Sequence, residues 1–120
     1  MNRSGRVPDY LDHILEAIAR IERYTADMVE TVFLDSELVQ DAVIRNIEII
    51  GEAANNVMRV DPEFATRNDH IPWMIMYTMR NRVAHGYDKV DVGVVWKTIQ
   101  RDLPPLYRDV HALRTALSAP

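Results

Sequence analysis

The stretch DYLDHILEAIARIERY at residues 9–24 decides the fold class. Its apolar side chains recur three and four positions apart, which is the spacing of one face of an α-helix. Pro8 and Asp9 suit the first turn of such a helix. The stretch therefore predicts an amphipathic helix with a continuous apolar face, formed by Tyr10, Leu11, Ile14, Leu15, Ile18, Ile21 and Tyr24.

The same helical spacing continues into the middle of the chain. Asp35 or Ser36 can cap a second helix that runs to about Met58. Asp61 with Pro62 can open a short helical turn, and Asn68 with Asp69 is typical of a loop. The apolar stripe predicted for the second helix consists of Leu38, Val39, Ala42, Val43, Ile47, Ile50, Ala53, Ala54 and Val57.

Two more helices are predicted in the second half of the chain. Residues 72–84 should form a third helix, which begins at a proline and ends just before Gly86. A fourth should begin after Asp91, and Pro104 with Pro105 must kink or break it because proline has no backbone donor. No strand pattern or internal repeat is found. The sequence predicts an all-α fold, an antiparallel four-helix bundle with a kinked or split C-terminal helix.

Length and composition bound what the chain can be. Its 120 residues, 48% of them hydrophobic and 27% charged, predict a single globular domain spanning 1–120. The absence of cysteine excludes disulfides, thiolate metal sites and cysteine nucleophiles. The longest apolar run, residues 71–77, is far too short to cross a bilayer, and no signal peptide precedes it, so we expect a cytoplasmic protein. With a net charge of −4, a nucleic-acid partner would need a local basic patch.

The stretch RNRVAHGY at residues 80–87 gathers groups that could act on a phosphate. Arg80 offers a planar fork of donors, and His85 offers a side chain that titrates near neutral pH. Asn81, four positions before the histidine, could orient the imidazole, and Tyr87 adds a phenol. These are the parts needed to cleave RNA without a metal ion.

The geometry of this stretch leaves two possibilities open. If the helix simply continues, Arg80 and His85 lie roughly 140° apart around its axis. If it ends at about Ala84–His85, with Gly86 turning the chain, the histidine is released from the helical rotation and can swing back toward the arginine. Cleavage needs both a base and an acid, and two sites facing each other across a symmetric dimer would supply two histidines. The mechanism therefore predicts a homodimer.

The local charge favours a phosphate-binding role, whereas the helix dipole offers a simpler explanation for an arginine and a histidine at this place. Between residues 67 and 89 the sequence holds four cations and two anions, a local charge of 4 − 2 = +2. However, arginine and histidine are common near helix C-termini simply because they complement the helix dipole. The cations are Arg67, Arg80, Arg82 and Lys89, and the anions are Asp69 and Asp88.

Three blocks stand in a fixed order along the chain: AVIRNIEIIGEAAN at 42–55, IPWMIMYTMRNRVAHGYDKVD at 71–91 and VWKTIQRDLPPL at 95–106. Together they resemble the second helix, the Arg-x4-His-x-Tyr core motif and the closing helix of the HepT-like family, a branch of the HEPN helical-bundle superfamily. The resemblance covers nearly the whole chain. One departure is Met74 after the tryptophan, where the family often carries a basic residue that could contact phosphate.

The resemblance implies the toxin of a type VII toxin–antitoxin pair, a dimeric, metal-independent endoribonuclease that uses no cofactor. It implies that Arg80 and His85 are the catalytic pair and that Asn81 supports them. It also implies neutralisation by a minimal nucleotidyltransferase antitoxin (MntA-like), which adds AMP to Tyr87. The complex with this antitoxin could be larger than a dimer. A bulky anion on that tyrosine would occupy the place of the substrate phosphate.

The second predicted helix carries further polar candidates. Glu48 and Glu52 are four positions apart, but without a histidine at ligand spacing they make a weak metal site, and an ion pair with Arg45 is the simpler interpretation. The resemblance places this helix near the site, which makes Arg45 and Glu48 candidate supporting residues. Gly51 costs about 1 kcal/mol relative to alanine inside a helix, which indicates a close approach of another helix.

Other candidates have structural interpretations, and two other functions remain open. The chain could be a non-catalytic bundle that binds a nucleotidyltransferase or nucleic acid, or a nucleotide-binding accessory subunit.

A base could stack on Trp73 or Tyr77 if either were exposed, although such aromatic residues are usually buried. We expect surface or packing roles for His13, His70 and His111, and core or dimer-interface roles for Trp73, Met74, Met76, Met79 and Trp96.

Overall fold

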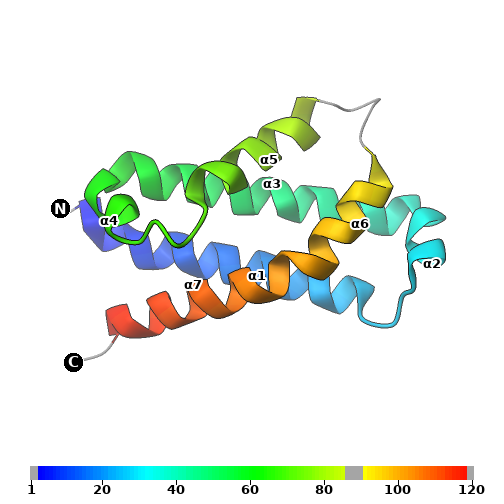
Figure 1. The fold of residues 1–120 in the computed structure, drawn as a ribbon, viewed down its shortest axis with the longest axis horizontal. Helices are drawn as coiled ribbons and strands as arrows, with labels where there is room; N and C mark the ends of the chain where they lie inside the picture. Colours follow the sequence, from blue (N-terminus) through cyan, green and yellow to red (C-terminus); the bar gives the residue numbers. More distant parts are fainter. Residues whose placement is uncertain (1–2, 86–90, 119–120) are drawn as a thin grey trace.

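The computed structural model describes the backbone of residues 3–85 and 91–118 and the side chains of residues 5–80 and 91–118. Within these ranges the chain is helical and contains no strand, so the predicted all-α fold is confirmed. Four long helical units build a bundle, and the last of them is split in two (Figure 1). The elements are η1 (Arg3–Arg6), α1 (Val7–Thr25), α2 (Glu30–Leu34), α3 (Glu37–Val60), α4 (Pro62–Arg67), α5 (Trp73–His85), α6 (Val92–Arg101) and α7 (Leu103–Ser118).

Helix α3 is the central element of the bundle. It packs against α1 on one side and against α5 on the other, while α7 packs against α1 (Figure 1). The buried hydrophobic side chains form a single cluster, in which Leu11, Ile14 and Ile18 of α1 are fully buried together with Val43 and Val57 of α3. The apolar periodicity of the sequence therefore identifies the faces that meet in this core.

Polar residues cap three helices, which begin where the sequence predicted; for Ser36 the capping role itself was predicted. Ser36 Oγ accepts a hydrogen bond from the backbone amide three positions on at 3.4 Å, and Asp61 Oδ1 does the same at 3.1 Å. Asp91 Oδ1 accepts from the amides two and three positions on, at 2.9 and 3.2 Å. Each cap satisfies amides that the first turn of a helix leaves without a partner, which is why these local signals located the starts of α3, α4 and α6 correctly.

The predicted break in the C-terminal helix is also confirmed. Helix α6 ends at Arg101 and α7 begins at Leu103, which places Pro104 and Pro105 in the first turn of α7. Proline has no backbone N–H. In the first turn of a helix an N–H would have no partner within the helix, so no hydrogen bond is lost there, whereas a proline in a helix interior removes one. The two prolines therefore fix where one helix stops and the next begins.

Helix α2 was not predicted, because five residues are too few to show a helical period. Tertiary contacts hold it in place. Phe33 is fully buried, and its ring centroid lies 5.2 Å from that of Trp96, which confirms that this tryptophan packs on the bundle. Buried Gln40 donates from Nε2 to the carbonyls of Phe33 and Leu34 at 2.9 and 3.0 Å, so it satisfies the C-terminal end of α2.

For two residues of the predicted apolar stripes the prediction is wrong, because their side chains are exposed. Tyr24 at the end of α1 is 38% exposed, and Leu38 in the first turn of α3 is 81% exposed. Periodicity identifies the face on which a residue lies, but it does not show whether a neighbouring element reaches far enough to cover that face. Both residues lie near a helix end, and Leu38 is left open to solvent.

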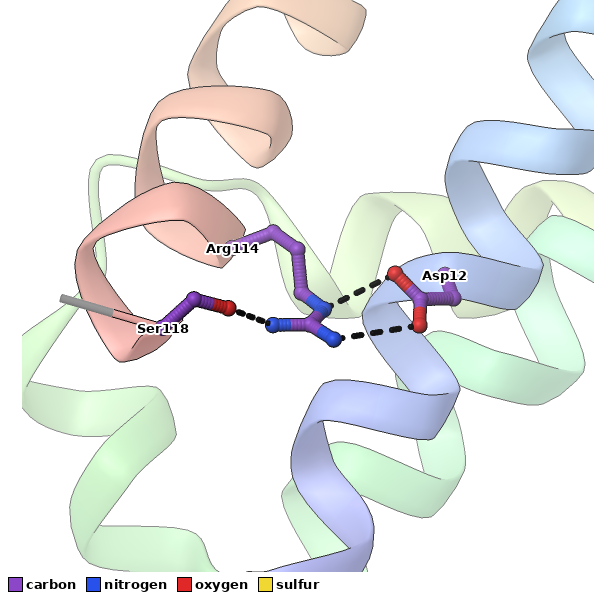
Figure 2. A network of polar contacts seen from close by, with 3 residues as sticks. All are labelled: Asp12, Arg114 and Ser118. Carbon is purple, nitrogen blue, oxygen red and sulfur yellow. Dashed lines mark hydrogen bonds and ion pairs between the residues drawn. The ribbon is translucent and has the colours of Figure 1, made fainter.

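Helices α1 and α7 are joined by a polar contact at the surface (Figure 2). Arg114 donates from Nε to one oxygen of Asp12 at 2.8 Å and from Nη2 to the other at 3.4 Å, and a third donor reaches Ser118 Oγ at 2.5 Å. Ion pairs this exposed contribute little stability, but the bidentate geometry favours one crossing of the two helices. Among the described helices, none combines the length and apolarity needed to cross a bilayer.

Candidate functional site

The stretch at residues 80–87 falls at the C-terminal end of α5. The helix runs from Trp73 to His85, within the bounds that the second of the two possibilities gave for its end, and Gly86 lies outside the described residues, so the choice between the two possibilities stays open. The side chains of Asn81 and His85, and Tyr87 as a whole, lie outside the described residues. Convergence of the guanidinium and the imidazole therefore stays a prediction.

Arg80 is seated directly on α3. Gly51 is buried on the face of α3 that meets α5, and a Cβ atom built on it would overlap the Cβ of Arg80. The same added atom would lie 2.7 Å from the backbone carbonyl oxygen of Met76. The prediction that this glycine marks a close helix approach is thus confirmed. The contact fixes the root of the Arg80 side chain, which is half-buried, relative to the core of the bundle.

The two sides of α5 differ in exposure. Trp73 and Met76, which precede Arg80 at helical spacing, are buried with exposures of 5% and 4%. Met74 is 59% exposed, so the opposite side of α5 is open to solvent at this position. The arginine is therefore on the inner side of α5.

An apolar groove runs beside α5. The helix packs on α3, and a groove of about 350 Å³ is lined by residues of α3, α5, α6 and α7. Thr98, Asp102 and Asp109 supply its polar edge. Ile75, which is 64% exposed, stands at this groove. The apolar lining includes Ile47, Ile50, Ile75, Met79, Leu103 and Leu106.

The predicted ion pair on α3 is present, but it is loose. Arg45 Nη1 lies 3.9 Å from Glu48 Oε2, and the two side chains are 64% and 30% exposed. Such a pair is worth little for stability. Glu48 lies three positions before Gly51 and thus on the same side of α3, whereas Glu52 is exposed. The supporting role of Arg45 and Glu48 stays a prediction, and within residues 5–80 and 91–118 no three acidic or histidine side chains group closely enough to hold a metal ion.

Trp73 is a structural residue rather than a platform for a base. Its Nε1 donates to the backbone carbonyl of Asn68 at 3.1 Å, and its ring centroid lies 6.4 Å from that of Phe64. Burial on α4 and the following loop leaves the ring unavailable for stacking, while Tyr77 is half-buried. The three remaining described histidines, His13, His70 and His111, are exposed, as predicted.

Comparisons with known proteins show the family to which the chain is similar. The family model described as "Ribonuclease HepT-like" matches residues 14–113. A Thermococcus cleftensis protein named "Probable ribonuclease HepT" is 42% identical over 114 residues, which cover 95% of this chain and 99% of that protein. A Caldanaerobacter subterraneus protein named "Putative RNase" is 35% identical over 102 residues, which cover 84% of this chain and 88% of that protein.

A relative of different length gives a further match. The Methanocaldococcus jannaschii protein named "Gamma-glutamylcyclotransferase and putative RNase" is 45% identical over 101 residues, which cover 84% of this chain. The match spans only 44% of that relative, so this chain corresponds to less than half of it. No solved structure matches the chain.

Proposed function

The chain belongs to the HepT-like ribonuclease family, and we propose that it is a cytoplasmic, metal-independent endoribonuclease acting as the toxin of a type VII toxin–antitoxin pair. The observation that carries the proposal is the 42% identity to a protein of nearly equal length named as a HepT ribonuclease. The seating of Arg80 on Gly51 supports it, because a phosphate-binding cation acts best when its position is fixed in advance.

In the proposed reaction the protein supplies a base, an acid and a fixed cation. His85 removes the proton from a ribose 2′-hydroxyl, and the oxygen attacks the adjacent phosphorus. The bond from phosphorus to the 5′ oxygen breaks, and a second histidine donates a proton to that oxygen. Arg80 stabilises the charge that builds up on the phosphoryl oxygens. Asn81 orients the base, and the Arg45–Glu48 pair on α3 supports the site.

We infer that a second copy of the chain supplies the second histidine and covers the groove beside α5. Apolar residues lie on both sides of this helix: Met76 is buried against α3, while Met74 and Ile75 are 59% and 64% exposed. Large apolar side chains that are exposed next to one another are typical of a surface that a partner covers. Two-fold pairing through this face would bring two motif-bearing helices together, since such an interface uses the same surface of both copies.

Replacing Ile75 with glutamate should convert the dimer to a monomer and lower RNA cleavage at least tenfold. The charge would have to be buried in an apolar contact, and the site would lose its second histidine. Wild-type protein should cleave RNA in EDTA and elute as a dimer. Light scattering after gel filtration gives the oligomeric state, and gel electrophoresis of the RNA gives the rate.

Leu117→Glu is the matched control. Leu117 is 43% exposed near the C-terminal end of α7, away from α5 (Figure 1), so this variant should remain dimeric and active. A fully active Ile75→Glu monomer would contradict the two-copy site. Absence of cleavage by well-folded wild-type protein would contradict the ribonuclease proposal itself.

The partner that regulates this site is, in the same proposal, a minimal nucleotidyltransferase that transfers AMP from ATP to the Tyr87 hydroxyl, with release of pyrophosphate. A phosphodiester beside the motif would repel the phosphate of an RNA strand. Incubation with such an enzyme and ATP should add the mass of one AMP and stop RNA cleavage. Tyr87→Phe should abolish the mass gain, and Tyr77→Phe should leave it intact. A modification that survives in Tyr87→Phe would rule this tyrosine out.

A further inference from the structure

Exposed apolar side chains concentrate at one end of the bundle. Nine large hydrophobic residues are exposed within the described side chains, and four of them fall between residues 29 and 38. Isolated exposed hydrophobic residues are ordinary, whereas a cluster marks an interaction surface. We call this cluster, on α2 and the first turn of α3 (Figure 1), the α2 patch; it consists of Val29, Val32, Leu34 and Leu38, exposed by 63%, 50%, 41% and 81%.

The stretch of chain that carries the α2 patch is acidic. Residues 24–44 contain five carboxylates and no lysine, arginine or histidine, which gives a local charge of −5 on a chain whose total is −4. All five carboxylate side chains are exposed. Exposed acidic residues are therefore interspersed with the exposed apolar ones along this stretch; the acidic ones are Asp27, Glu30, Asp35, Glu37 and Asp41.

The patch is held by fixed contacts. Phe33, within α2, is fully buried against Trp96, so the inner side of this short helix is already filled. Gln40 is buried and holds the carbonyl end of α2 through two hydrogen bonds. The neighbouring Val32 and Leu34 consequently lie on a helix whose backbone is already held in place before a partner arrives.

Charge decides what kind of partner fits. RNA would be repelled by the five carboxylates, since nucleic-acid binding depends on cations. A second copy meeting this surface across a two-fold axis would place carboxylates opposite carboxylates. We propose that the α2 patch docks a different protein, one that presents an apolar segment flanked by lysine or arginine. This surface is distinct from the α5 groove, and its existence does not depend on RNA cleavage.

A pair of peptides tests the proposal. One is a short amphipathic helix with a leucine stripe flanked by lysines, and the other carries glutamates in place of the lysines. In fluorescence anisotropy the full chain should bind the lysine peptide and not the glutamate peptide. Leu38→Ser should weaken this binding roughly tenfold or more, as expected for losing one buried leucine. Neutralising Glu37 and Asp41 to glutamine and asparagine should also weaken binding and reduce its dependence on salt.

The control is Leu117→Ser, which removes an exposed leucine at another part of the surface and should bind as wild type. Because Leu38 is 81% exposed, its replacement should leave the melting temperature unchanged. Equal binding of both peptides, equal effects of Leu38→Ser and Leu117→Ser, or no binding at all would overturn the proposal. So would ultraviolet crosslinking of RNA to residues 29–38, or self-association that Leu38→Ser abolishes.

Discussion

Replacing Arg80 or His85 with alanine should lower the rate of RNA cleavage about 100-fold or more while the bundle stays folded. The histidine variant removes the group that exchanges the proton, and the arginine variant removes the charge that stabilises the attacked phosphate. Arg80→Ala retains the Cβ atom that packs on Gly51, so the contact between α5 and α3 is preserved. Single-turnover cleavage of RNA in EDTA measures the rate, and a thermal melt followed by circular dichroism measures the fold.

Matched controls come from residues of the same type elsewhere. Arg101→Ala at the end of α6 and His111→Ala on α7 remove exposed side chains and should leave cleavage unchanged. A folded His85→Ala protein that cleaves at the wild-type rate would eliminate His85 as the base. Equal losses in His85→Ala and His111→Ala would likewise count against a specific role for the motif.

Gly51→Ala should destabilise the protein by about 1–3 kcal/mol and slow RNA cleavage. The new methyl group would overlap the Cβ of Arg80 and press against the Met76 carbonyl oxygen, 2.7 Å away. Neither is the end of a flexible side chain, so α5 as a whole must move away from α3, and Arg80 moves with it. In an open helix the same change would be stabilising by about 1 kcal/mol, so the expected sign is opposite to the helix propensity. Urea unfolding measures the free energy.

Gly5→Ala is the control for this substitution, because nothing lies within 4 Å of a Cβ atom added there. It should leave both stability and cleavage close to wild type. If Gly51→Ala were as stable as the wild-type protein, the close seating of α5 on α3 would be wrong. If it were destabilised but equally active, the position of Arg80 would not limit the reaction.

Much of the fold was predictable because its signals are local. Ser36, Asp61 and Asp91 cap the helices that follow them, and the two adjacent prolines mark the break before α7. Each of these effects depends only on residues within one turn, so a sequence displays them directly. The five-residue helix α2 escaped prediction because it depends on Phe33 meeting Trp96, a partner far along the chain.

For the candidate site, the sequence determined which groups lie along α5 and in what order, and their catalytic roles stay a prediction. It also indicated that Gly51 lies at a close approach, but not what approaches it. Only the packing of α5 on α3 decided that Arg80 meets this glycine. That contact joins residues that are distant in the chain, where the shape of the whole core, rather than any local preference, selects one arrangement.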